Sequence, residues 1–311
     1  MQDKTICVVG GSGFVGRYVV SALVTHGFRV KVMARHSVDI KALSFSGDAD
    51  QVVFVQGDVT NFEAVTRHVA GAHAVINLTG ILFEKGRQTF DAIHRDASER
   101  LAKAAKEAGV PIFVQMSALG VDRATDSRYA ATKLQGEQAV RDVMPDVVII
   151  RPSVVFGAED NFFNQFARMA QYSPFLPLIG GGHTRFQPVY VGDVAEVIAQ
   201  CVMRPKDAAG QCFELGGPDV MTFRELLEYL LRVTALRARF MSIPFGVASV
   251  QAWFAEWLPT PLLTRDQVRL LRYDNVLCGA WPGMEVLGVK ATPVDEVVPG
   301  YLQRYKKRLK F

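Results

Sequence analysis

A glycine-rich segment between the first apolar run and the first helical pattern constrains the fold of this chain more than any other feature. Residues 5–9 have the length and composition of a short buried strand, and residues 14–26 carry apolar side chains at helical spacing. The connecting segment is Gly10, Gly11, Ser12, Gly13, Phe14, Val15 and Gly16. Glycines in this strand–turn–helix context are typical of a loop that holds the pyrophosphate of a dinucleotide.

Three of these glycines have separate physical reasons. Gly10 permits the tight turn after the strand, Gly13 lets backbone N–H groups approach a pyrophosphate at the positive end of a helix, and Gly16 allows close helix–strand packing. The alternative is a glycine-rich turn that holds no ligand. The residues predicted to bind the cofactor in this segment are Gly10, Ser12, Gly13, Phe14, Val15 and Gly16.

Strand and helix patterns alternate along the first half of the chain. Strands are expected at residues 5–9, 29–33, 51–55, 74–78, 111–116 and 147–150, and helices at residues 14–26, 61–69, 93–108 and 129–143. This alternation predicts an α/β fold with a doubly wound parallel sheet of the Rossmann type. We expect a dinucleotide-binding domain over residues 1–151. Residues 152–311 should form a smaller C-terminal α/β lobe, substrate-side or docking, interleaved with the first.

Composition and charge restrict the class of protein. The net charge is +4, but the last eight residues contain Arg304, Lys306, Lys307, Arg308 and Lys310, so the remainder is close to neutral. A nucleic-acid-binding face is therefore not expected. The four cysteines have no metal-ligand spacing, so no metal site is predicted. The N-terminus shows no signal-peptide pattern, so we expect a cytoplasmic protein.

The end of the second expected strand bears on cofactor choice. A site for NAD(H) usually has an acidic residue there, whereas this chain has Arg35 followed by His36. A guanidinium suits a 2′-phosphate, so NADP(H) is favoured and NAD(H) is the alternative. Asp58, followed by Val59, comes after the third strand. Asp58 either accepts from the adenine amino group or caps the helix at residues 61–69.

Tyr129 and Lys133 lie four residues apart at the start of an expected helix, so they share one face of it. An ammonium near a phenol is expected to lower the phenol pKa, and such a tyrosine transfers a proton while a nicotinamide transfers a hydride. Lys133 is also expected to hydrogen-bond the ribose hydroxyls. Ser117, at the end of the fifth strand, is expected to polarise a carbonyl. These three residues are the predicted catalytic group.

With these motifs in place, the chain resembles the short-chain dehydrogenase/reductase superfamily, in its extended and atypical branches. Further matches are the segments RPSVVFG at residues 151–157 and QPVYVGDVA at residues 187–195. The resemblance covers essentially the whole chain. It implies further cofactor-binding residues at the ends of the fourth and sixth strands, namely Leu78, Thr79, Gly80 and Pro152.

A narrower resemblance is to the dehydrogenase-like accessory subunit of respiratory complex I and its bacterial relatives. It rests on residues 75–82, 90–94, 262–268 and 274–276. This group holds NADPH tightly, and the resemblance implies a membrane protein complex as one partner. His94 stands where active extended members often have Asn, which puts a standard proton relay in doubt. The alternative is a partly buried histidine with a satisfied ring.

Two functions follow. The first is an NADP(H)-dependent oxidoreductase acting on a carbonyl or quinone-related small molecule. The second is a non-catalytic, NADPH-holding accessory or assembly protein of a membrane respiratory complex.

Residues 245–258 form an apolar, aromatic helix pattern that is too short to span a bilayer. It either lies in a membrane interface, at the inner face of the membrane, or packs against protein.

Overall fold

The computed structural model describes residues 4–35 and 51–306. Its centre is a sheet of parallel strands in the order β11-β6-β5-β4-β1-β2-β3. The strands are β1 (Thr5–Val9), β2 (Arg29–Ala34), β3 (Val52–Gln56), β4 (Ala74–Asn77), β5 (Ile112–Met116), β6 (Val148–Pro152) and β11 (Cys212–Leu215). The predicted doubly wound parallel sheet is confirmed, because neighbouring strands on both sides of β1 run parallel to it.

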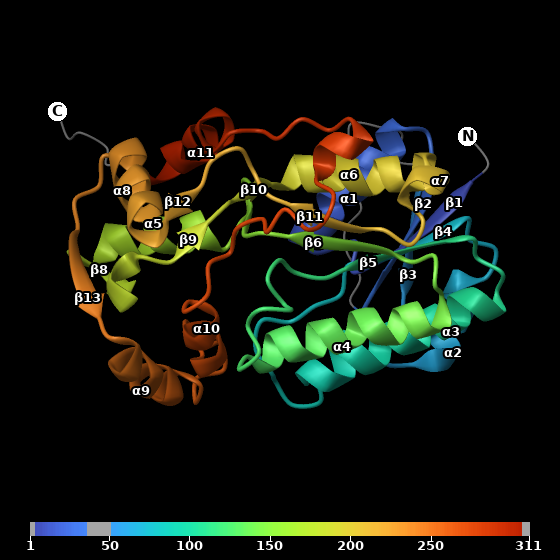
Figure 1. The fold of residues 1–311 in the computed structure, drawn as a ribbon, viewed down its shortest axis with the longest axis horizontal. Coiled ribbons are helices and arrows are strands. Elements are labelled where there is room, and N and C mark those ends of the chain that lie inside the picture. The colour runs from blue at the N-terminus through green and yellow to red at the C-terminus, as the bar shows by residue number, and fades with distance from the viewer. Residues whose placement is uncertain (1–3, 36–50, 307–311) are drawn as a thin grey trace.

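Helices cover both faces of this sheet (Figure 1). One face carries α1 (Phe14–Thr25) and α6 (Val191–Met203), with the short α7 (Pro205–Ala208) after α6. The other face carries α2 (Phe62–Val69), α3 (Ala97–Glu107) and α4 (Arg128–Val143). The strands are apolar on both sides, so each face supplies a separate buried layer. The helix expected at residues 93–108 begins as a π-helical turn, Asp91–Asp96, before it continues as α3.

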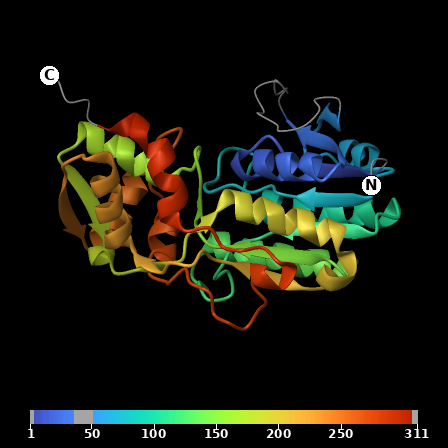
Figure 2. The same ribbon diagram turned by 90° about the horizontal axis from the view of Figure 1, so that it is seen from above.

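A smaller α/β lobe lies beside the sheet (Figure 2). Its helices are α5 (Phe162–Tyr172), α8 (Phe223–Thr234), α9 (Phe245–Ala255), α10 (Arg265–Leu270) and α11 (Val294–Leu302). Its strand pairs are β8 (Phe175–Ile179) with β13 (Arg239–Ile243), β9 (Arg185–Phe186) with β12 (Met221–Thr222), and β7 (Val155–Phe156) with β10 (Val189–Tyr190). A separate aromatic core, which includes Phe156, Phe163 and Phe223, holds the lobe together.

The chain crosses between the sheet and the lobe more than once. β11 pairs with β6 at the sheet edge, and α6 packs beside α1, although both elements follow residue 151. Elements that follow residue 151 therefore complete the sheet and cover it, and the division of the chain into domains at residue 151 stays a prediction. Within the described residues, no helix combines the length and the apolar character that crossing a membrane requires.

Candidate functional site

The glycine-rich loop connects β1 to α1 at the carboxyl edge of the sheet. Gly10 has φ +83°, a left-handed conformation that favours glycine, and its N–H donates to the Met33 carbonyl at 3.1 Å. A Cβ on Gly16 would lie 2.4 Å from the Gly10 carbonyl oxygen, so this position tolerates only hydrogen. Gly13 is the residue before α1, and within the described residues no side chain caps the first turn of this helix. The loop thus presents unpaired helix N–H groups at a position suited to a phosphate.

The end of β4 lies directly against this loop. A Cβ on Gly10 would lie 3.3 Å from the carbonyl carbon of Leu78 and 3.4 Å from the nitrogen of Thr79. The buried Asn77 fixes this turn, because its Oδ1 accepts from the N–H and the hydroxyl of Thr79 at 3.1 and 2.6 Å. Asn77 in turn donates to Gln115 at 2.9 Å. Four of the predicted cofactor-binding positions are therefore brought together: Gly10, Leu78, Thr79 and, next in the chain, Gly80.

Tyr129 and Lys133 approach the same place from α4. The Lys133 ammonium donates to the carbonyls of Thr79 and Met116, at 3.3 Å each. A Cβ on Gly80 would lie 3.1 Å from Lys133 Nζ, so the absence of a side chain there makes room for the ammonium. Burial lowers the pKa of Lys133 to about 8. The predicted lysine therefore lies beside the predicted loop after β4.

His94 joins the loop after β4 to α4 beside the tyrosine. Its Nε2 accepts from the backbone N–H of Ile81 at 3.1 Å, and its Nδ1 lies 3.0 Å from the Thr132 hydroxyl. Because Nε2 accepts, the neutral ring carries its proton on Nδ1, and this N–H donates to the Thr132 hydroxyl. Burial, with Lys133 nearby, lowers the pKa of His94 to about 2. The ring lies edge-on to Tyr129, with centroids 5.2 Å apart.

The phenol of Tyr129 differs from expectation in its acidity. Burial raises its pKa to about 12, whereas the sequence predicted a lowering by Lys133. The physical reason is that the Lys133 ammonium is directed to the carbonyls of Thr79 and Met116, while the phenol ring is enclosed by Phe90 and His94. Tyr129 is therefore held as a neutral phenol, which is the form that donates a proton.

Ser117 follows β5 at the same edge. Its N–H donates to the Ile150 carbonyl at 2.7 Å, and its side chain is buried. Among the described residues, the Ser117 hydroxyl has no hydrogen-bond partner. Buried hydroxyls are normally paired, so an orphan of this kind at a candidate site fits a group that bonds a ligand. Pro152 ends β6 nearby, and its carbonyl accepts from the N–H of Leu119 at 2.9 Å.

The predicted ribose and adenine contacts lie at β2 and β3. Arg35 is exposed immediately after β2, and His36 lies outside the described residues. Asp58 is exposed, and its Oδ1 accepts from the N–H and hydroxyl of Thr60 at 2.9 and 2.8 Å. The N-cap of α2 is Asn61, which accepts from the N–H of Ala64, so the interpretation of Asp58 as that cap is wrong. Val59 is buried.

A cavity of about 530 Å³ opens beside Tyr129. It is enclosed by the loop after β4, the start of α4 and the segment from the end of α9 to α10. One wall is apolar and comes from Phe83, Phe90, Leu258, Pro259 and Pro261. The Phe90 ring, which lines this cavity, also lies 5.9 Å from the Tyr129 ring, centroid to centroid.

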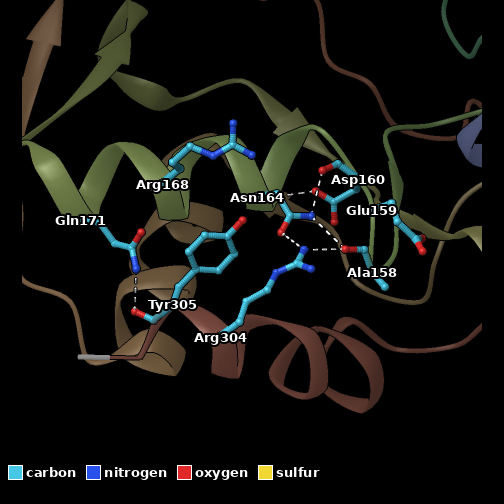
Figure 3. Close-up of a pocket in the computed structure, with 8 residues that line it drawn as sticks. All are labelled: Ala158, Glu159, Asp160, Asn164, Arg168, Gln171, Arg304 and Tyr305. Carbon is cyan, nitrogen blue, oxygen red and sulfur yellow. Dashed lines mark hydrogen bonds between the residues drawn. The ribbon is translucent and has the colours of Figure 1, made fainter. Parts of the chain in front are cut away.

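A second cavity, of about 470 Å³, lies in the lobe between α5 and the end of α11 (Figure 3). Its polar groups mostly bond one another. Arg304 donates to the Ala158 carbonyl at 2.6 Å and to the Asn164 side chain, and Gln171 donates to the Tyr305 carbonyl. None of the predicted site residues lines this cavity. Its bonds hold the end of the described chain against α5.

Sequence reasoning missed the residue that caps α4. Asp266, on α10, accepts from Arg128 N and Tyr129 N at 2.9 Å each and from the Ser127 hydroxyl at 2.8 Å. Its one signal in the sequence was its place in the segment at residues 262–268, which carries no chemistry by itself. As for metals, the described residues contain no cluster of His, Cys, Asp and Glu suited to holding an ion.

Comparison with known proteins identifies the family. A family model described as NAD(P)H-binding matches residues 10–205. The chain is 35% identical to NADH dehydrogenase (ubiquinone) 1 alpha subcomplex subunit 9 of Arabidopsis thaliana, covering 87% of this chain and 70% of that protein. It is 34% identical to the Rattus norvegicus protein of that name, covering 96% and 80%. A ceramide reductase of Caulobacter vibrioides is 27% identical over 81% of this chain and 78% of its own length.

Solved structures share the fold at low identity. A dTDP-glucose 4,6-dehydratase of Streptomyces venezuelae matches with a TM-score of 0.75 and 20% identity, covering 97% of this chain and 96% of that one. An NADPH-dependent quinone oxidoreductase of Escherichia coli matches with a TM-score of 0.74 and 18% identity, covering 96% and 99%. The chain therefore belongs to the NAD(P)H-binding, short-chain dehydrogenase-like proteins, in the group that contains subunit 9 of the 1 alpha subcomplex of mitochondrial NADH dehydrogenase.

Proposed function

We propose that this protein is an NADP(H)-dependent oxidoreductase that acts on a carbonyl or quinone-related small molecule. The observation that carries the proposal is the convergence of three side chains at the carboxyl edge of the sheet. Lys133 Nζ lies at the loop after β4, Tyr129 is one turn before it on α4, and the Ser117 hydroxyl is buried without a partner among the described residues. The names of two similar proteins, a ceramide reductase and a quinone oxidoreductase, add support.

The residues have distinct roles in this proposal. The nicotinamide, when bound, supplies or accepts a hydride. Tyr129, which burial keeps protonated, donates its proton to the substrate oxygen, and the Ser117 hydroxyl donates a hydrogen bond to the same oxygen. Lys133 donates to the ribose hydroxyls in place of a backbone carbonyl. The pyrophosphate lies on the loop formed by Gly10, Ser12, Gly13, Phe14, Val15 and Gly16.

The preference for NADP(H) is part of the proposal. Arg35 is exposed at the end of β2, where a carboxylate would bond the ribose 2′-hydroxyl of NAD(H). A guanidinium at this position pairs with the 2′-phosphate in a charge-assisted, two-pronged contact. The exposed Asp58 is proposed to accept from the adenine amino group, because only Thr60 among the described residues bonds its carboxylate.

The test separates binding from chemistry. Tyr129→Phe removes only the phenolic hydroxyl, so it should leave the NADPH dissociation constant within about twofold of wild type while hydride transfer falls by about a hundredfold or more. Lys133→Ala should instead weaken NADPH binding. The measurements are fluorescence titration and the decay of reduced-nicotinamide absorbance with quinones and aliphatic ketones. Retained hydride transfer in Tyr129→Phe would remove the mechanism.

A second candidate function is that of a cofactor-holding accessory protein. The observation that favours it is the identity of 34% to subunit 9 of rat NADH dehydrogenase over 96% of this chain. The site adds that both His94 nitrogens are engaged, so this ring does not pass a proton onward. This function predicts NADPH that co-purifies with the protein and does not turn over with any of the same quinones and ketones.

We propose that the protein contacts the inner face of a membrane, directly or through a membrane protein complex. The support is the outer side of α9, which exposes Val250, Trp253 and Phe254 while Ala248 and Ala252 face inward. Trp257, two residues after the helix ends, is exposed as well. Tryptophans are favoured at the depth of lipid headgroups. Of the basic residues at the C-terminus, Lys307, Arg308 and Lys310 lie outside the described residues. Arg304 donates to the Ala158 carbonyl in the loop before α5, and Figure 1 shows α11 and α9 at opposite edges of the lobe.

A further inference from the structure

We propose that Asp266 is a positioning residue for the proposed reaction: its carboxylate fixes the first turn of α4 and thereby the placement of the Tyr129 phenol. This inference rests on the proposed role of Tyr129. The catalytic helix and the capping carboxylate are 137 residues apart in the chain. The lobe therefore supplies a part of the site that the sheet and its own helices lack.

The start of α4 needs a cap. The first N–H groups of a helix have no acceptor within that helix, and they fray unless another group accepts from them. α4 has no acidic residue in its own first turn. Its own N-cap is Ser127, whose hydroxyl oxygen accepts from Ala130 N at 3.2 Å. The two N–H groups that remain, of Arg128 and Tyr129, both donate to Asp266 at 2.9 Å.

The charge of the Asp266 carboxylate strengthens this cap. A carboxylate accepts more strongly from N–H groups than a neutral oxygen does, and it interacts favourably with the positive end of a helix. Asp266 uses both oxygens, since Oδ1 accepts from Arg128 N and Oδ2 from Tyr129 N and the Ser127 hydroxyl. The Asp266 side chain is 13% exposed, so water screens these contacts only slightly.

Asp266 is itself held in place. Thr264 caps α10, and its hydroxyl accepts from Gln267 N while the Gln267 side chain accepts from Thr264 N. Val268 is fully buried in the small apolar core beneath α9, with Ala248 and Ala252. The carboxylate therefore reaches α4 from a short helix that is anchored at its start and along its buried side.

Tyr129 and Lys133 are held in place by different contacts. Tyr129 is in the first turn of α4, so its backbone is placed by Asp266 directly. Lys133 is one turn further along, and the carbonyls of Thr79 and Met116 hold its ammonium independently. Loss of the cap should therefore disturb the phenol much more than the ammonium. A merely structural role would disturb both, or neither.

The test uses Asp266→Asn, with Asp274→Asn as the matched control. Asp274 also accepts from a backbone N–H, of Arg185 at 2.8 Å, and among the described residues its carboxylate is hydrogen-bonded to Arg185 and not to α4. Asp266→Asn should lower hydride transfer by about ten- to a hundredfold, since misplacement by about 1 Å has effects of this size. Its NADPH dissociation constant should stay within about threefold. Asp274→Asn should change neither quantity.

A second readout does not need a substrate. In protein labelled at the tyrosine ring carbon that bears the hydroxyl, NMR titration should find the Tyr129 pKa clearly above its ordinary value in the wild type, because the ring is buried. In Asp266→Asn it should fall toward the ordinary value of about 10, because a displaced ring is less enclosed. Ser127→Asp combined with Asp266→Asn should restore both readouts, since Asp is itself a good N-cap.

Three results would overturn the inference. One is an Asp266→Asn protein that keeps wild-type Tyr129 titration and transfer. The second is a variant that loses NADPH affinity and Tyr129 titration together. The third is a variant that is only less stable, with Tyr129 unchanged in the folded protein. Failure of the proposed function gives a different result. Tyr129→Phe would then keep its activity, while the titration of Tyr129 in wild type and in Asp266→Asn would still report on the role of Asp266.

Discussion

His94 decides how far the proposed chemistry extends beyond Tyr129. Its Nε2 accepts from Ile81 N and its Nδ1 donates to the Thr132 hydroxyl, which itself donates to carbonyls of the first α4 turn. The ring therefore connects the loop after β4 to the helix that carries the tyrosine. We infer that His94 orders the site and does not relay protons, because neither nitrogen is available to exchange one with Tyr129.

The buried His94 predicts a specific pH dependence of stability. Its pKa is lowered to about 2 in the folded protein, so below about pH 6.5 the unfolded chain binds a proton that the folded protein does not. The contribution of His94 to stability is complete above that pH and falls by about 1.4 kcal/mol per pH unit below it. Between about pH 7 and about pH 5, wild type should lose about 2 kcal/mol more than His94→Asn.

The measurement is urea denaturation of both proteins at the two pH values, and the difference between them isolates this one side chain. Asn is a suitable replacement because its side-chain oxygen also accepts from a backbone N–H. Parallel losses in the two proteins would show that His94 is protonated in the fold, and the assignment of its ring nitrogens would then be wrong.

Single elements show what the sequence predicts and what it cannot. The bounds of β1, β5 and α4 agree with the expected ranges to within a residue, because glycines and apolar periodicity mark their ends. The π-helical turn Asp91–Asp96 was not predictable from local pattern. It lies where α4 comes closest, since a Cβ on Gly136 would be 2.1 Å from the His94 carbonyl oxygen. The capping of α4 by Asp266 was not predictable for the same reason, because Asp266 is distant from α4 in the chain.

The helix α9 illustrates a further limit of sequence reasoning. Its apolar spacing is equally consistent with packing and with exposure, and only the fold shows that Trp253, Phe254 and Trp257 are 43%, 64% and 79% exposed. Packing against the protein's own fold is seen on the inner side, where Ala248 and Ala252 are fully buried. A contiguous aromatic surface of this kind usually marks an interaction site.

The exposed face of α9 should bind lipid vesicles. Burying each tryptophan in an interface contributes on the order of 1–2 kcal/mol, so Trp253→Ser with Trp257→Ser should reduce vesicle flotation by about tenfold or more. Tyr172→Ser is the control, because Tyr172 is 85% exposed at the end of α5. If wild type stays in the soluble fraction with anionic vesicles and native membranes alike, α9 is assigned to protein contacts.

At the scale of the whole molecule, the lobe and the sheet are parts of one site. Asn275 shows this, because its side chain donates to the Leu119 carbonyl after β5 and accepts from Ser153 and Val154 after β6. Asp266 acts in the same way on α4. The segment between α9 and α11 therefore closes the carboxyl edge of the sheet, which is where parallel α/β folds bind their ligands.

The central claim is that this edge binds NADP(H) through Arg35, and calorimetric titration tests it most directly. Wild type should bind NADPH more tightly than NADH. Arg35→Asp should weaken NADPH binding by a few kcal/mol, at least about tenfold, because it replaces a charge-assisted contact with repulsion, and it should barely change NADH binding. Arg29→Asp, at the exposed opposite end of β2, is the control and should change neither. Wild-type preference for NADH, or an equal loss of both cofactors in Arg35→Asp, would contradict the account.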